Sequence, residues 1–84
     1  MENIKYNIVT LKNGNSYFVL EEVSDNFDTY NLILNVEDEK DIKIVMQEVK
    51  NGKIVLTEVR DLLNLSSLKV LFKNKIEESR DALR

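Results

Sequence analysis

Carboxylates are the side chains of this 84-residue sequence that could do chemistry, because the chain contains no histidine and no cysteine. Those two residue types supply the usual general base, the thiolate nucleophile and the commonest metal ligands of enzymes. The densest acidic run is residues 37–41, which follows Asp25 and Asp28 along the chain. The run lacks the alternating ligands, the turn glycine and the terminal Glu of a calcium-binding loop. We therefore expect no metal, no cofactor and no enzymatic activity.

Charge is unevenly distributed along the chain. With 12 basic and 15 acidic residues the net charge is −3. Residues 1–41 hold nine acids against three lysines, and residues 42–84 hold six acids against nine bases. An asymmetry of this kind marks either an interaction surface or loops that are simply solvated. The acidic residues that could form one binding surface are Glu21, Glu22, Asp25, Asp28, Glu37, Asp38, Glu39 and Asp41.

Direct binding of nucleic acid is not expected. The basic residues of the C-terminal segment, Lys69, Lys73 and Arg80 among them, are interleaved with acidic residues. Interleaving breaks up the positive stripe that contacts phosphates and is typical of ordinary pairing on a helix surface. Tyr17 and Tyr30 sit within apolar alternations, which favours packing in a sheet over stacking on bases.

The elements that must position these side chains are organised around segment 29–36. One side of this segment carries Tyr30, Leu32, Leu34 and Val36, and the other carries Thr29, Asn31 and Asn35. This alternation is the period-2 pattern of a half-buried strand and places the segment in the middle of a sheet. Residues 24–28 form a turn by composition, and Phe27 is expected to tuck beneath the strand.

The first hairpin is predicted from Asn13-Gly14, which favours a two-residue type I′ turn because both residues tolerate a positive φ. It would join strands at about 4–12 and 16–23. Such a loop pairs Val9 with Phe18 and places both on one face. The residues of that face, which we take as a candidate interface, are Val9, Leu11, Phe18 and Leu20.

The second hairpin is predicted from Asn51-Gly52 by the same reasoning and joins strands at about 42–50 and 53–59. The two-residue loop pairs Val49 with Ile54 and Gln47 with Leu56. In both hairpins, neither face is purely polar.

From Asp61 onward the apolar residues recur at helical spacing. Asp61 and either Ser66 or Ser67 compete as N-cap, so we expect the helix to begin within 61–67 and place it at about 66–82. The apolar stripe consists of Leu65, Leu68, Phe72, Ile76 and Leu83, widened by Leu71. The predicted fold is therefore a single α+β domain over residues 1–84. An antiparallel five-strand meander in the order 1-2-3-4-5, or a bent half-barrel, packs on one C-terminal helix.

The apolar content of both sheet faces points to an interaction function. One helix covers one face, so the other face must curl on itself, meet another chain or stay exposed. We expect a non-enzymatic protein-interaction or structural module that acts through an apolar face or edge. Its partner is another protein or a second copy, with a homodimer as the first expectation. The alternative is a small phage-type inhibitor, such as an anti-CRISPR or other anti-defence protein, whose acidic surface blocks a basic nucleic-acid-binding groove.

The order of these elements resembles a group of short, uncharacterised acidic proteins of bacteria and their phages. The resemblance covers residues 6–76 and rests on Leu11-Lys12-Asn13-Gly14, Tyr17, Tyr30 and Asn51-Gly52. It implies the fold and carries no activity or site residue with it.

The size and the first residues of the chain indicate its stability and its location in the cell. A domain of 84 residues buries a modest core, so its stability is marginal and a second chain would add to it. The first residues show no basic region followed by an apolar core, and no apolar run approaches the ~20 residues of a membrane span. We therefore expect a cytoplasmic protein with no membrane segment.

Overall fold

The computed structural model describes residues 4–82 and confirms the α+β class. The elements in chain order are β1 (Ile8–Thr10), β2 (Ser16–Asp25), β3 (Asp28–Asn35), β4 (Ile42–Lys50), β5 (Lys53–Glu58) and α1 (Leu62–Ala82). All four strand pairs are antiparallel and the sheet order is β1-β2-β3-β4-β5. The predicted meander is therefore correct.

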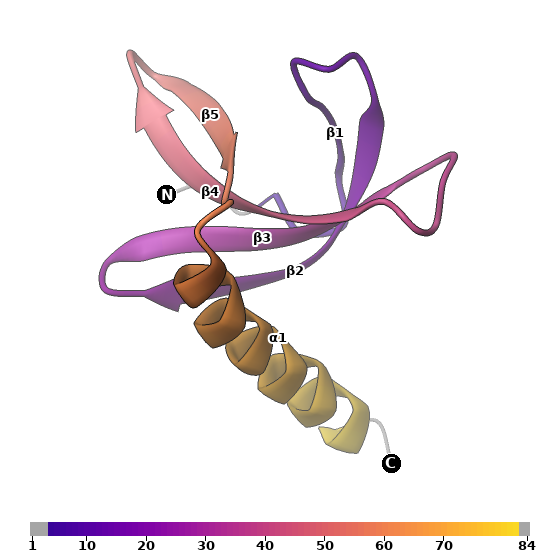
Figure 1. Ribbon diagram of the computed structural model, residues 1–84, viewed down its shortest axis with the longest axis vertical. Helices are drawn as coiled ribbons and strands as arrows, with labels where there is room; N and C mark the ends of the chain where they lie inside the picture. The colour runs from indigo at the N-terminus through magenta and orange to yellow at the C-terminus, as the bar shows by residue number, and fades with distance from the viewer. Residues whose placement is uncertain (1–3, 83–84) are drawn as a thin grey trace.

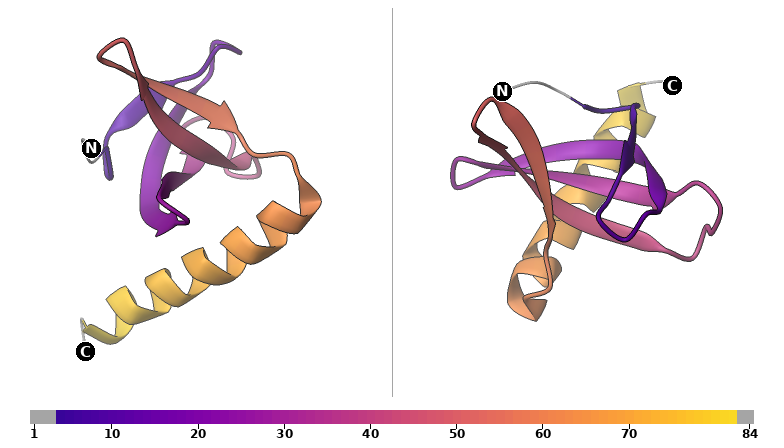
Figure 2. Two further views of the ribbon diagram at one scale, coloured as in Figure 1. Left: turned by 90° about the vertical axis from the view of Figure 1, so that its left-hand side faces the viewer. Right: turned by 90° about the horizontal axis from the view of Figure 1, so that it is seen from above.

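The sheet is curled into a half-barrel. The β1–β2 and β4–β5 hairpins rise on one side of the β2–β3–β4 layer, and α1 crosses the opposite side (Figures 1 and 2). The register of β2 against β3 shifts between Val19 and Glu21, which is a β-bulge. Bulges bend a strand and increase its twist, so this one contributes to the curl.

The concave face of the half-barrel holds the larger core cluster. Its buried members are Ile4, Tyr17, Val19, Ile33 and Val45, with Val9, Leu11, Ile54 and Leu56 packed against them. In β3 the fully buried residues are Asn31 and Ile33, whereas Leu32 is only half-buried. The side of this strand that carries Asn31 is therefore the more deeply buried one, because the curled sheet closes over it.

The helix covers the other face through a second cluster. Its buried members are Ile44, Leu68 and Phe72, with Val23, Tyr30, Leu32, Val59, Leu65 and Leu71 around them. The helix begins at Leu62, four residues before the predicted start at 66, because Asp61 caps it. The Asp61 carboxylate accepts a hydrogen bond of 3.0 Å from the Leu63 amide. Ile76 is 41% exposed, and Leu83 lies outside the described residues.

The first hairpin differs from its prediction by one residue of register. Leu11 donates to the Asn15 carbonyl and Gly14 donates to the Leu11 carbonyl, so the loop has three residues, 12–14. Only Gly14 has a positive φ, at 85°, which is the type I turn followed by a left-handed glycine. As a result Val9 lies opposite Tyr17 instead of Phe18.

The predicted strand 4–12 is reduced to Ile8–Thr10. Residues 4–7 form a turn in which the Asn7 amide donates to the Ile4 carbonyl and Tyr6 has a φ of 72°. This turn folds Ile4 back into the concave core, where it is 7% exposed.

The β2–β3 and β4–β5 turns each have two central residues, both with positive φ. Asn51 and Gly52 have φ of 53° and 77°, and Val49 lies opposite Ile54, so the second hairpin is confirmed. Between β2 and β3 the turn is Asn26-Phe27, with φ of 51° and 71°. The expectation that Phe27 tucks beneath β3 is wrong, because this turn points its ring into solvent at full exposure.

Candidate binding groove

An apolar groove lies between the two edge strands of the half-barrel. Its volume is about 460 Å³. Residues from the N-terminal turn, from β1 with its following turn, and from β5 line it. They are Ile4, Val9, Thr10, Leu11, Lys12, Ile54, Val55 and Leu56. A hollow of about 280 Å³ shares Leu11 and Leu56 with this groove and extends it to Arg60.

The backbone of both edge strands carries groups beside this groove that have no hydrogen-bond partner within residues 4–82. The Val59 amide donates to the Ile44 carbonyl, so these two residues form a hydrogen-bonded pair. Bonded and non-bonded pairs alternate along an antiparallel ladder, so the pairs of Ile54 with Val49 and of Leu56 with Gln47 are non-bonded. The amides and carbonyls of Ile54 and Leu56 therefore point away from β4. In the β1–β2 pair, the Val19 amide donates to the Asn7 carbonyl, so Asn7 and Val19 are a bonded pair and the same alternation applies to β1.

On that side, the backbone groups of Ile8 and Thr10 point away from β2. The exposed edges of β1 and β5 thus flank one apolar hollow. Free edges of this kind are the usual template for pairing with another polypeptide chain.

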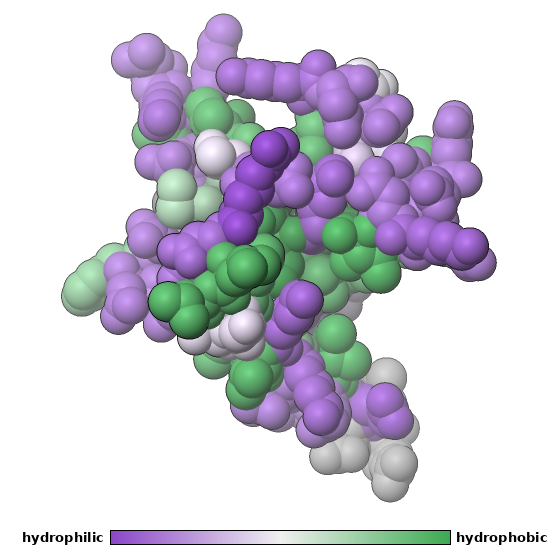
Figure 3. Space-filling view, in the orientation of Figure 1, coloured by the Kyte–Doolittle hydropathy of each residue, from purple (hydrophilic) through white to green (hydrophobic). Residues whose placement is uncertain are grey.

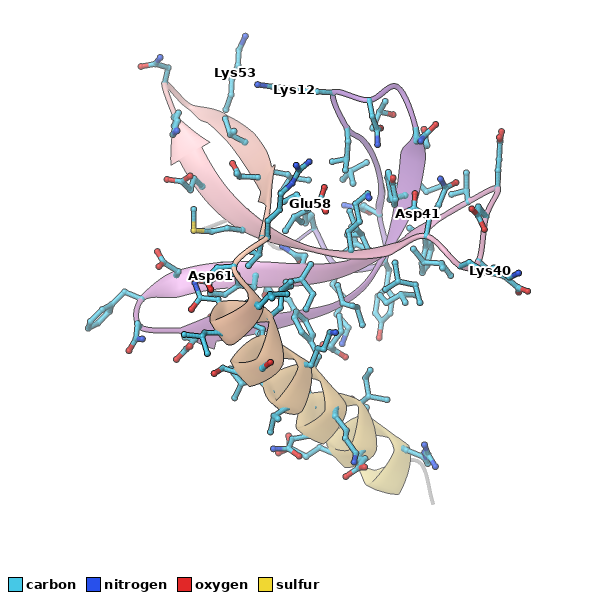
Figure 4. The ribbon with its side chains drawn as sticks, viewed as in Figure 1. Lys12, Lys40, Asp41, Lys53, Glu58 and Asp61 are labelled. Atoms are coloured by element: carbon cyan, nitrogen blue, oxygen red, sulfur yellow. The ribbon has the colours of Figure 1, made fainter. Side chains whose placement is uncertain are left out.

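The mouth of the groove is basic. Lys12 lines the groove, and Figure 4 shows its side chain extending from the turn after β1 in the direction of the β4–β5 hairpin, on which Lys53 lies. Within residues 4–82 neither lysine forms an ion pair. The carboxylate of Glu58, at the end of β5, already lies 3.8 Å from the Lys43 ammonium and 3.5 Å from the Arg60 guanidinium.

A polar network anchors the β1–β2 arm beside the groove. The buried Tyr17 hydroxyl donates a hydrogen bond of 2.6 Å to Asp41 and lies 3.2 Å from the Asn13 amide nitrogen. Asn35 also donates to Asp41, and Lys43 is 3.1 Å from it. The Tyr17 hydroxyl, then the Asn35 amide, hold the pKa of Asp41 below its ordinary value, and Asp41 in turn raises the pKa of Lys43. The network ties the first turn to the β3–β4 loop.

A buried amide pair lies on the strands below the arms. The Asn31 amide nitrogen donates to the Gln47 carbonyl oxygen at 2.7 Å, and the two residues are 0% and 2% exposed. The Asn31 carbonyl oxygen is buried with no hydrogen-bond partner among the described residues. Such an atom lowers stability, so the pair is a weak point of an otherwise apolar core.

The four residues of the predicted interface do not share a face. Val9 and Leu11 line the groove, as part of the concave side. Phe18 lies with Leu34 at a different hollow beside the β3–β4 loop. Leu20 occupies the bulge, where the strand register passes from Val19 to Glu21. The one-residue change in the first hairpin is the reason, because a shift of one residue exchanges the faces of a strand.

The acidic residues near the bulge are engaged within the domain. Glu21 is 4% exposed and forms an ion pair of 3.0 Å with Lys5, whose ammonium lies 4.9 Å from the Tyr6 ring centre. The Glu21 hydrogen bond raises the pKa of Lys5. Glu22, which is half-buried, donates its amide to the Glu21 carboxylate.

The other acidic residues fall into two groups at opposite ends of β3. Asp25 and Asp28 flank the β2–β3 turn, and the run 37–41 forms the β3–β4 loop. Glu37, Asp38 and Glu39 are exposed there. The eight carboxylates therefore do not form one continuous surface.

Two exposed leucines lie at the start of the helix and were not among the predicted interface residues. Leu62 and Leu63 are 78% and 82% exposed, and Figure 3 shows hydrophobic side chains gathered over this part of the molecule. The observed start lies within the predicted interval 61–67, but the helix was placed at about 66–82, after both leucines. A start directly after Asp61, one of the candidate caps, would have placed both on the helix and away from its apolar stripe.

Comparison with known proteins does not assign the chain to a family. No protein-family model, curated protein or solved structure matches the chain. Within residues 4–82, no group of three or more acidic side chains is placed to hold a metal ion. No helix in the described part of the chain is long and apolar enough to cross a membrane.

Proposed function

We propose that this domain is a protein-interaction module that binds an extended polypeptide segment between β1 and β5. The observation that carries the proposal is an apolar groove flanked by the edges of β1 and β5, whose outward backbone groups have no hydrogen-bond partner within residues 4–82. An added strand gains affinity from main-chain hydrogen bonds and specificity from alternate side chains that enter pockets. Here the pockets are formed by Val9, Leu11, Ile54 and Leu56.

Thr10 offers a sharp test, because its amide points toward the free edge and its side chain is exposed. Thr10→Pro removes that donor, and Thr10→Val is the matched control that keeps it. Both variants lose the hydroxyl, which lies 3.0 Å from the Ser16 hydroxyl. A library of random ten-residue peptides displayed on phage is selected against the wild type, and the enriched peptides are measured by fluorescence anisotropy. We expect Thr10→Pro to weaken binding by about threefold to tenfold, the value of one net hydrogen bond, and Thr10→Val to bind as the wild type.

Amide exchange supplies a measurement that does not depend on a variant. In the free protein the amides of Ile54 and Leu56 should exchange faster than that of Val55, which is bonded within the sheet. Binding of a selected peptide should protect them. Selection of no peptide, or protection confined to another surface, would refute the proposal.

Self-association is a second form of the same proposal, in which an edge of one copy pairs with an edge of another. Analytical ultracentrifugation of the wild type should then show a mass that rises with concentration, and Thr10→Pro should remain a monomer. A monomer across the micromolar range would leave only a different polypeptide as the partner.

The acidic inhibitor has less support, because its carboxylates are divided between the two ends of β3. The exposed group Glu37, Asp38 and Glu39 is the part of the proposed surface that could still contact a basic groove. Reversing these three charges should abolish such binding and its salt dependence, and should leave peptide uptake at β1 and β5 intact.

A further inference from the structure

We infer that the segment taken up between β1 and β5 is acidic at the end that lies beside Lys12 and Lys53. This inference rests on the proposed function and names the partner as an extended acidic peptide of another protein. The carboxylate of that peptide would lie between the two ammonium groups at the mouth of the groove.

The two lysines reach the mouth from separate parts of the chain. Lys12 belongs to the turn after β1 and lines the groove together with Ile54 and Leu56. Lys53 is the first residue of β5, directly before Ile54. Both are exposed, and in the view of Figure 4 the Lys12 side chain extends in the direction of the β4–β5 hairpin that carries Lys53. A guest strand that contacts the edges of both arms therefore passes Lys12 and the start of β5, where Lys53 lies.

Among residues 4–82, no carboxylate lines the main hollow of the groove. Lys12 is the charged residue among those lining the main hollow. Glu58, in the adjoining hollow, already interacts with Lys43 and Arg60. A guest carboxylate thus meets two positive charges that have no ion-pair partner within residues 4–82, whereas a guest lysine is repelled by both.

A second copy of this chain is a poorer guest. Its own edge strand β1 carries no acidic residue, and β5 carries only Glu58, which is engaged. Its acidic run 37–41 is a loop held by the bonds of Asp41 to Tyr17 and Asn35. The charge pattern therefore favours a separate polypeptide that is extended and acidic.

Three synthetic peptides test the inference. Each has the same alternating Val/Thr core and differs only at its two ends, which are Asp, Asn or Lys. Placing the residue at both ends makes the result independent of the direction in which the peptide enters. At low salt we expect the Asp peptide to bind about threefold to tenfold more tightly than the Asn peptide, and the Lys peptide to bind more weakly than both. These differences should shrink in 0.5 M salt because exposed charges are screened, as expected for a Debye length of roughly 4 Å.

Two charge-reversal variants separate the local effect from net charge. Lys12→Glu with Lys53→Glu should invert the order of the three peptides. Lys40→Glu with Lys73→Glu changes the net charge equally, lies away from the groove and should keep the wild-type order. Equal binding of all three peptides, or inversion by the control pair, would overturn this inference and leave strand uptake standing. Failure of all three to bind or to protect the Leu56 amide would overturn both proposals.

Discussion

Replacing Phe27 by glycine should stabilise the domain, although it removes a large aromatic side chain. Phe27 occupies the second central position of the β2–β3 turn with a φ of 71°, and its side chain is fully exposed. The left-handed conformation costs a non-glycine residue about 1–2 kcal/mol. Glycine avoids that cost but loses more freedom on folding, which removes roughly 0.5–1 kcal/mol of the gain.

The expected net gain is therefore about 0.5–1 kcal/mol, with no loss of buried contacts to set against it. For a domain of this size it corresponds to a rise in melting temperature of roughly 2–8 °C. Thermal unfolding followed by circular dichroism measures this shift directly. Phe27→Ala is the matched control, because it removes the ring but keeps the Cβ, and it should stay within about 0.5 kcal/mol of the wild type.

Two results would contradict this reasoning. If Phe27→Ala raised the melting temperature as much as Phe27→Gly, the exposed ring and not the backbone conformation would be the source of the instability. If Phe27→Gly melted below the wild type, the ring would make stabilising contacts that are inconsistent with its exposure.

Three further predictions concern the cores and the polar network. Gln47→Leu should lower the free energy of unfolding by about 1–3 kcal/mol in urea, because it leaves the buried Asn31 amide nitrogen without that acceptor, and adding Asn31→Val should recover part of the loss because it removes both polar atoms of Asn31. The pKa of Asp41 is lower in the folded state, so its contribution to stability is present above about pH 4 and is lost as the pH falls through the folded pKa. Asp41→Asn should therefore flatten the acid side of the stability profile, and Glu39→Gln, at an exposed position, should not. Leu68→Ala should lower the free energy of unfolding by about 2–5 kcal/mol, because this side chain is 2% exposed between the helix and the sheet.

The dipeptide Asn-Gly occurs twice in the chain, and the two copies show that local sequence alone does not determine the type of turn. Asn51-Gly52 forms the two-residue turn that its residue types favour, with both φ angles positive. Asn13-Gly14 does not, because the Asn13 side chain accepts a hydrogen bond from the Asn15 amide and contacts the Tyr17 hydroxyl. That hydroxyl also donates to Asp41, which is 24 residues further along the chain. A bond between distant residues thus accompanies a register that the turn residues alone did not predict.

The sequence by itself determined the elements and their order. Period-2 and helical spacing are local properties, so the meander, the bounds Ile42–Lys50 of β4 and the C-terminal helix could be predicted. Side-chain alternation states that a strand has two different faces, but it does not state which face becomes buried. Only the curl of the whole sheet decided that the Asn31 side of β3 lies inside. The groove is decided in the same way, because curvature brings together the edges of β1 and β5 from opposite ends of the meander, and no local pattern encodes that approach.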